Sequence, residues 1–220
     1  MPFKAVIFDL DGTLLNTLAD IGNSANWALE KRGFPVHPLE SYRNFIGDGA
    51  GQLIRRVLPA DNHDETVFQA CLADFQQEYG RNWNVQTKPY PGVPEMLDLV
   101  VASGLVPAVL SNKPDTFTQK CVSELLSKWR FEAVLGASAA FPRKPDPAGA
   151  LEIAGRLKVP PGRILYVGDS GVDMRTAVAA GMFAVGVLWG FRGREELRQG
   201  GAQAILEHPL EIRKLIEVET

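Results

Sequence analysis

Short strand-like runs that alternate with helical segments constrain the fold of this chain more than any other feature. Five runs rich in β-branched and aromatic residues, each bounded by Gly, Asp, Ser or Pro, are too short for helices. They span residues 3–8, 106–110, 131–135, 164–167 and 183–187. Helical segments are predicted at residues 93–102, 115–129, 147–157 and 173–180. Since parallel strands need crossover helices, this alternation predicts an α/β fold with a doubly wound parallel sheet, that is, a Rossmann-like core.

The stretch between the first and second runs breaks the alternation. It contains no convincing buried strand, and it shows helical patterns at residues 18–32, 39–45, 49–58 and 64–79. One hinge is expected near residues 13–16 and another at 88–92, where Pro and Gly limit both helix and strand. We therefore predict an inserted α-helical cap domain at residues 18–87, with an α/β catalytic core formed by residues 1–17 and 88–220.

Composition and charge narrow the expected partners. The 220 residues include 23 Lys and Arg and 26 Asp and Glu, so no overall positive field would draw the chain to nucleic acid or to an anionic membrane. No apolar stretch reaches the roughly 20 residues that span a bilayer. Cys71 and Cys121 lack disulfide or zinc-site spacing, which together with the absence of a signal-peptide pattern predicts a cytoplasmic protein. Small molecules are the expected partners, and the sequence does not indicate an oligomeric state.

Chemically active side chains follow the predicted strands. They are Asp9 and Asp11 after the first run, Ser111 and Asn112 after the second, Lys144 in the loop after the third, and Asp169 and Asp173 after the fourth. Ligands of open α/β sheets bind outside the carboxyl ends of the strands, so we expect these side chains to meet in one cleft.

Four carboxylates in one partly dry cleft would repel each other unless cations neutralised them. Carboxylate and carbonyl oxygens without nearby His or Cys favour Mg²⁺ over zinc. A magnesium ion with few protein ligands leaves room for water and for a phosphate group. The acidic cluster therefore predicts a Mg²⁺ cofactor and a small phosphorylated substrate.

The remaining side chains suit phosphoryl transfer. Lys144 supplies a point charge and Ser111 a hydroxyl donor for a bound phosphate, and backbone amides after Asp9 and at Asn112 would complete the cradle. A carboxylate can attack phosphorus to form an aspartyl-phosphate, and a second acid two residues later can protonate the leaving alkoxide and then deprotonate water. The pleat of a strand would place Asp9 and Asp11 on the same side.

In order and spacing, these residues resemble the four motifs of the haloacid dehalogenase superfamily. The matching segments are Asp9-x-Asp11-Gly12-Thr13-Leu14, Ser111-Asn112-Lys113, Lys144-Pro145 and Gly168-Asp169-Ser170-x-x-Asp173. Within the superfamily the chain is similar to the phosphoglycolate phosphatase branch, through Arg143-Lys144-Pro145-Asp146-Pro147, Tyr166-Val167-Gly168-Asp169-Ser170 and the segment at residues 43–49.

This resemblance implies a role for each acidic residue. Asp9 would be the nucleophile and a magnesium ligand, and Asp11 the general acid and base, whose main-chain carbonyl also binds the metal. Asp169 would be the third protein ligand of the metal. Asp173 would have a supporting or water-mediated role, or would complement the dipole of the helix that it begins.

The resemblance also implies which residues contact the substrate. Ser111 and Lys144 would bind the transferring phosphate with Asn112 beside them, and the charge of Lys144 would orient Asp9. Arg43, near the glycines at residues 47 and 49, could reach over the cleft to bind a substrate carboxylate or exclude water, although a surface helix junction explains the glycines nearly as well.

We therefore predict a magnesium-dependent phosphoric monoester hydrolase that works through an aspartyl-phosphate on Asp9. Phosphoglycolate is the substrate that the resemblance suggests. The dehalogenases of this superfamily lack the second aspartate, so Asp11 argues for phosphoryl transfer. The alternatives are a phosphatase for pyrophosphate or nucleotides, a phosphomutase, and a non-catalytic binding protein, against which the intact acidic residues argue.

Overall fold

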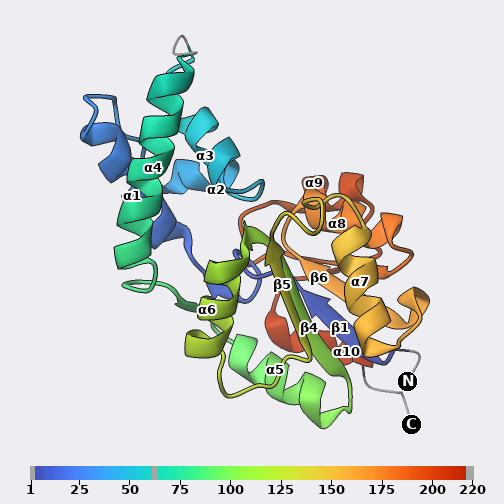
Figure 1. Ribbon diagram of the computed structural model, residues 1–220. Coiled ribbons are helices and arrows are strands. Elements are labelled where there is room, and N and C mark those ends of the chain that lie inside the picture. Colours follow the sequence, from blue (N-terminus) through green and yellow to red (C-terminus); the bar gives the residue numbers. More distant parts are fainter. Residues whose placement is uncertain (1–2, 61–63, 217–220) are drawn as a thin grey trace. The chain divides into compact units, whose positions relative to one another are not determined.

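A six-stranded parallel sheet forms the centre of the computed structural model, which describes residues 3–60 and 64–216. Its strands in spatial order are β5 (Ala133–Ala137), β4 (Val106–Pro114), β1 (Ala5–Phe8), β6 (Ile164–Gly168), β7 (Phe183–Val187) and β8 (Ala204–Leu206). Each neighbouring pair is parallel. The chain steps outward from β1 to β4 and β5 and then returns to β6 on the other side of β1 (Figure 1). The doubly wound sheet is therefore confirmed, and its direction of winding changes between β1 and β6.

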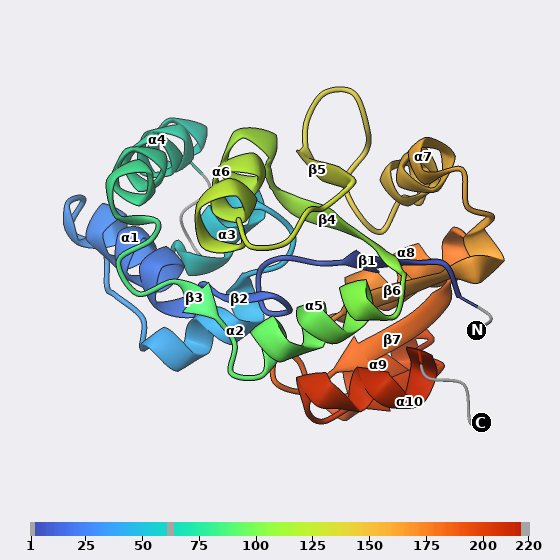
Figure 2. The ribbon, with the colours of Figure 1, turned by 90° about the horizontal axis from the view of Figure 1, so that it is seen from below.

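Helices cover both faces of this sheet. On one face lie α7 (Ala148–Leu157), α8 (Gly171–Ala179) and α9 (Arg194–Gly200), which share one apolar cluster with the strands. On the opposite side lie α5 (Val93–Ala102), the 3-10 turn η3 (Pro209–Ile212) and α10 (Arg213–Ile216) (Figure 2). The helix α6 (Asp115–Leu125) packs along β4 and β5, and a short 3-10 turn η2 (Pro161–Arg163) precedes β6. Burial on both faces explains why the strands read as continuous apolar runs.

The strands differ from the sequence-based expectation most clearly at β4 and β8, and β5 lies two residues later than the run expected at 131–135. The expected run at residues 106–110 continues as β4 to Pro114, through the polar residues Ser111, Asn112 and Lys113, all of which are buried. The sixth strand, β8, was not expected, because it has three residues and pairs only with β7 at the edge of the sheet. A search for apolar runs does not find the end of β4, because its residues are polar, and does not find β8, because it is short.

The chain divides into two compact units. The core unit comprises Met1–Leu15 and Pro89–Thr220, and the inserted unit comprises Asn16–Lys88. The inserted unit contains the helices α1 (Leu18–Glu30), η1 (Leu39–Ser41), α2 (Tyr42–Phe45), α3 (Ala50–Val57) and α4 (Glu65–Asn82). Two short strands, β2 (Leu15–Asn16) and β3 (Lys88–Pro89), pair with each other where the chain passes between the units. The insertion after the first strand is thus helical, as the sequence predicts, and its action as a cap stays a prediction.

A buried carboxylate near the beginning of the inserted unit accepts hydrogen bonds from residues near its end. Asp20, on α1, accepts hydrogen bonds from the backbone amides of Gln86 and Thr87 and from the Thr87 hydroxyl, at 2.8–3.0 Å. Helix α1 also packs along α4, which lies beside it in Figure 1. Both ends of the insertion are therefore held together by contacts within the unit itself.

Two further expectations concern the chain as a whole. Cys71 and Cys121 are both buried free thiols, as their spacing predicts. Within residues 3–60 and 64–216, no helix combines the length and the apolar character needed to cross a lipid bilayer.

Candidate active site

The predicted site residues of the core unit gather at the carboxyl ends of three adjacent strands. Asp9 directly follows β1, Asp169 directly follows β6, and Ser111 and Asn112 lie in the last part of β4. Lys144 comes from the loop between β5 and α7. Because β1 and β6 flank the point at which the winding of the sheet reverses, the site occupies the position where open α/β sheets bind their ligands.

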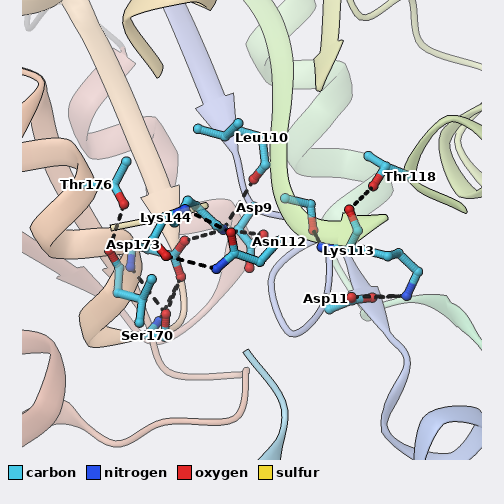
Figure 3. A network of polar contacts seen from close by, with 12 residues as sticks. Asp9, Asp11, Leu110, Asn112, Lys113, Thr118, Lys144, Ser170, Asp173 and Thr176 are labelled. Carbon is cyan, nitrogen blue, oxygen red and sulfur yellow. Dashed lines mark hydrogen bonds and ion pairs between the residues drawn. The ribbon is translucent and has the colours of Figure 1, made fainter. Parts of the chain in front are cut away.

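Lys144 is the centre of a buried ion cluster. Its Nζ lies 2.7 Å from Asp9 Oδ1 and 2.7 Å from Asp173 Oδ1, and it donates a further hydrogen bond to the Leu110 carbonyl at 3.3 Å (Figure 3). The side chains of Lys144, Asp9 and Asp173 are at most 10% exposed. The two carboxylates raise the pKa of Lys144 well above its usual value, against the opposing effect of burial. The lysine is therefore a fixed positive charge beside Asp9.

Asn112 holds the backbone of Lys144 in place. Its Oδ1 accepts from the Lys144 amide at 2.9 Å, and its Nδ2 donates to the Lys144 carbonyl at 3.2 Å. The sequence does not reveal this contact, because the two residues are 32 positions apart. Asn112 thus positions Lys144, and the expected contact of Asn112 with a phosphate stays a prediction.

Asp173 supports the cluster from the first turn of α8. The Ser170 amide donates to Asp173 Oδ2 at 3.2 Å and the Asp173 amide donates to Ser170 Oγ at 3.3 Å, which makes a capping box. The Ser170 hydroxyl also donates to Asp173 Oδ2, at 2.6 Å. The other carboxylate oxygen of Asp173 accepts from Lys144. Asp173 therefore lies at a helix N-terminus and in contact with Lys144, and its supporting role at the metal stays a prediction.

Three carboxylates are close enough to share a cation. Asp9, Asp169 and Asp173 each offer an oxygen atom, and these atoms all lie within 4.8 Å of one another. Burial raises the pKa of Asp9 to about 7 even with Lys144 beside it. Burial also raises the pKa of Asp169 well above its usual value, and the negative charges of Asp173 and Asp9 add to that rise. A cation at this position would relieve the repulsion, and an all-oxygen donor set suits Mg²⁺ better than zinc.

Glycines allow the backbone to pack directly against the acidic residues. A Cβ atom at Gly12 or at Gly190 would overlap the Asp169 side chain, and one at Gly168 would overlap Asp173. Gly12 also has a φ of +89°, which other residues rarely adopt. The Phe191 amide, next to Gly190, donates to Asp169 Oδ2 at 2.7 Å. The turn after β1 and the loop after β7 thus fix the position of Asp169.

We expect Gly12→Ala to destabilise the core unit more than a glycine substitution without this close contact. Gly104→Ala is the matched control, because Gly104 also has a positive φ of +74° but nothing within 4 Å of its added Cβ. Backbone strain should cost the control about 1–2 kcal/mol. Overlap with Asp169 should add about 1–3 kcal/mol for Gly12→Ala. Urea denaturation measures both, and equal losses in the two variants would contradict the proposed packing.

Lys113 is a site residue that the sequence analysis missed. Its Nζ lies 3.0 Å from Asp11 Oδ1 and 3.1 Å from Asp11 Oδ2 (Figure 3). Its amide donates to Ser111 Oγ at 3.2 Å, and both residues are buried. A continuation of β4 beyond Leu110 would have been a signal, since alternation along a strand puts Ser111 and Lys113 on one side. The contacts of Ser111 and Asp11 with a substrate stay predictions.

Arg43 belongs to the inserted unit. Its Nε donates to Glu40 Oε2 at 2.7 Å on the exposed side of that unit. The nearby glycines Gly47 and Gly49 have φ values of +130° and +86°, so the backbone conformation alone accounts for glycine at both positions. The expected contact between Arg43 and a substrate stays a prediction.

Fold and site together define a class of protein: an α/β protein with acidic residues at the switch point of a doubly wound sheet and a helical insertion after its first strand. Residues 6–187 match the model of the haloacid dehalogenase-like hydrolase family. The chain belongs to this family, which confirms the superfamily that its motifs resemble.

Individual relatives agree with this assignment. The chain is 35% identical to a phosphoglycolate phosphatase of Thiobacillus denitrificans over 198 residues, which cover 88% of this chain and 87% of the relative. It is 33% identical to a phosphoglycolate phosphatase of Nitrosospira multiformis in an alignment of 222 positions, which covers 99% of this chain and 97% of the relative. The crystal structure of a predicted phosphoglycolate phosphatase from Haemophilus somnus matches with a TM-score of 0.91 and 31% identity, over 99% of each chain. The predicted enzyme class, a phosphoric monoester hydrolase similar to phosphoglycolate phosphatases, is thereby confirmed.

Proposed function

We propose that this chain is a magnesium-dependent phosphatase that hydrolyses a small phosphate monoester, with phosphoglycolate as its first candidate substrate. The observation that carries the proposal is the buried ion cluster in which Lys144 Nζ lies 2.7 Å from Asp9 Oδ1, beside the carboxylate of Asp169. Such a cluster provides a fixed nucleophile, a positive charge and a set of oxygen ligands in one place. The relatives named phosphoglycolate phosphatase support the choice of substrate.

Asp9 is the proposed nucleophile. Its carboxylate would attack the phosphorus atom, so that a P–O bond forms to Asp9 as the bond to the leaving oxygen breaks. Lys144 holds one oxygen of Asp9 and supplies positive charge next to the position of the phosphate. Ser111 would donate its hydroxyl to a phosphate oxygen. Water then hydrolyses the aspartyl-phosphate, which releases phosphate and restores Asp9.

Asp11 is the proposed general acid and base. In the first step it would give a proton to the leaving alkoxide, and in the second it would take a proton from the attacking water. It lies two residues after Asp9, on the turn that follows β1. Two acidic residues thus divide the work, one forming the covalent bond and the other moving protons.

Asp9, Asp169 and the main-chain carbonyl of Asp11 would hold the magnesium ion, with Asp173 in support. When bound, the ion neutralises the buried carboxylates and the charge of the phosphate group. The all-oxygen character of this cluster is the observation that fits magnesium.

Phosphate release from a panel of esters tests the proposal. The panel contains phosphoglycolate, pyrophosphate, nucleotide monophosphates, hexose phosphates and p-nitrophenyl phosphate, each with magnesium and with a chelator. We expect release to depend on magnesium, with a loss of about 100-fold or more in chelator, because the buried carboxylates would then repel the phosphate. A preference for phosphoglycolate supports that substrate. Isomerised sugar phosphate without free phosphate would instead indicate a mutase. Phosphate release that persists in chelator would contradict the proposed dependence on magnesium.

A further inference from the structure

We propose that Lys113 is a positioning residue for Asp11, because its ammonium group contacts both oxygens of the Asp11 carboxyl group and holds that group in one orientation. The inference rests on the proposed function, because it takes Asp11 as the general acid and base. It assigns a role in catalysis to the third residue of the Ser111-Asn112-Lys113 segment.

The contact is close and involves both oxygens of the carboxylate. Lys113 Nζ lies 3.0 Å from Asp11 Oδ1 and 3.1 Å from Asp11 Oδ2. A cation that holds both oxygens limits rotation of the carboxyl group about its bond to Cβ. The side chain of Asp11 is therefore held in one orientation although it is less buried than its neighbours.

The surroundings of Lys113 fix the ammonium group in turn. The Lys113 side chain is 4% exposed. Its carbonyl accepts from the Thr118 hydroxyl at 3.1 Å, and its amide donates to Ser111 Oγ at 3.2 Å, so the backbone is held from α6 and from within β4. Lys113 thus acts from a rigid strand, unlike a surface lysine with many rotamers.

An ion pair with an ammonium group as buried as that of Lys113 is poorly explained as a source of stability. Removal of an ammonium group and a carboxylate from water costs several kcal/mol per ion, and apolar residues of similar size often stabilise a protein as well or better. Asp11 is 102 residues away from Lys113 in the sequence and lies at the proposed reaction centre. A function at that centre accounts for the pair more directly.

Each of the two proposed catalytic acids has its own lysine. Lys144 pairs with Asp9 and Asp173, whereas Lys113 pairs with Asp11. Asn112, between the two in the chain, faces Lys144, and Figure 3 shows Lys113 directed the other way, toward Asp11. The nucleophile and the proton-transfer group are therefore held independently.

This arrangement predicts where Lys113 matters in the reaction. As the P–O bond to the leaving group breaks, the proton of the Asp11 carboxyl passes to the leaving oxygen, and this transfer requires the carboxyl group to be held toward that oxygen. An alkoxide needs that proton, but p-nitrophenolate is stable without it. Lys113 should thus contribute much more to the hydrolysis of alkyl esters than to that of p-nitrophenyl phosphate.

The test compares kcat/KM for two esters in Lys113→Met, which keeps the length of the side chain and removes its charge. The ratio kcat/KM reports only the steps up to departure of the leaving group, whereas kcat also contains the hydrolysis of the aspartyl-phosphate, which is common to both esters and also uses Asp11. The esters are p-nitrophenyl phosphate and the alkyl phosphate on which the wild type is most active. We expect kcat/KM for the alkyl ester to fall about 10- to 100-fold, and about tenfold further than kcat/KM for the aryl ester. Lys128→Met is the matched control, because Lys128 pairs with Asp98 on the surface and should change neither value.

A double variant tests whether Lys113 acts through Asp11. If Lys113 acts through Asp11, the Asp11→Asn variant has already lost this contribution. Adding Lys113→Met to it should therefore not lower the activity on the alkyl ester any further relative to the activity on the aryl ester. Equal losses of kcat/KM on both esters in Lys113→Met, or a further loss on the alkyl ester relative to the aryl ester in the double variant, would overturn the inference. If the wild type releases no phosphate from any ester, the proposed function itself fails, whereas an active wild type with equal losses in Lys113→Met removes only the role of Lys113.

Discussion

Replacement of Asp9 by Asn is expected to reduce phosphate release by at least about 10⁴-fold. The carboxamide has almost the same shape as the carboxylate, but it cannot attack phosphorus to form an aspartyl-phosphate. Folding should be little affected, because Lys144 keeps its ion pair with Asp173 at 2.7 Å and its hydrogen bond to Leu110. Phosphate release with magnesium measures the first effect, and thermal unfolding measures the second.

A matched control makes this result specific. Asp98→Asn is the same chemical change on the surface, where Asp98 contacts Lys128 and Trp129, and it should leave phosphate release unchanged. A pure and folded Asp9→Asn preparation that still released phosphate at an appreciable rate would contradict Asp9 as the nucleophile.

The meeting of the acidic residues could be predicted from the sequence because it follows from the topology. Asp9 and Asp169 each follow a short apolar run, and parallel strands have their carboxyl ends at one edge of the sheet. The pairing of β1 with both β4 and β6 then brings these ends together. No detail of side-chain packing was needed for that expectation.

The partners of individual side chains could not be predicted in the same way. Residues 111–113 read as a polar loop, since a strand of this length is expected to end at Leu110, yet they are the buried end of β4. Once the strand continues, its alternation directs Asn112 toward Lys144 and Lys113 toward Asp11. Long-range pairings such as these depend on the three-dimensional fold and leave no periodic signal along the chain.

Close packing by glycine was equally hidden. The sequence shows Gly12 in a motif and Gly190 in a loop after the last expected strand, but not that both lie against Asp169. Glycine marks a turn in most sequences, so its second use, direct approach of the backbone to a buried acid, is visible only in the structure. The acidic site is therefore shaped by residues that carry no chemistry of their own.

Lys144→Met is expected to lower the free energy of unfolding of the metal-free protein by about 3–5 kcal/mol, because it leaves the carboxylates of Asp9 and Asp173 buried without their shared cation. Lys128→Met, which breaks a surface pair, is the control and should have a much smaller effect. Denaturant unfolding in the presence of a chelator measures the difference. Similar losses in the two variants would show that the ion cluster does not depend on Lys144.

The size of this loss should depend on pH. The pKa of Asp9 is raised from 3.8 to about 7 in the folded protein, and removal of the adjacent ammonium should raise it further. A carboxyl group with a raised pKa binds its proton more tightly in the folded than in the unfolded chain, so its contribution to stability decreases as the pH rises from the unfolded pKa through the folded one. At about pH 5 Asp9 is protonated in the folded variant and needs no cation. At about pH 8 the variant must either ionise Asp9 next to Asp173 or keep Asp9 protonated, and both cost free energy of folding. The deficit of Lys144→Met relative to the wild type should therefore be smaller at the lower pH, and a deficit that grew on acidification would contradict the assignment of Lys144 as the counter-charge of Asp9.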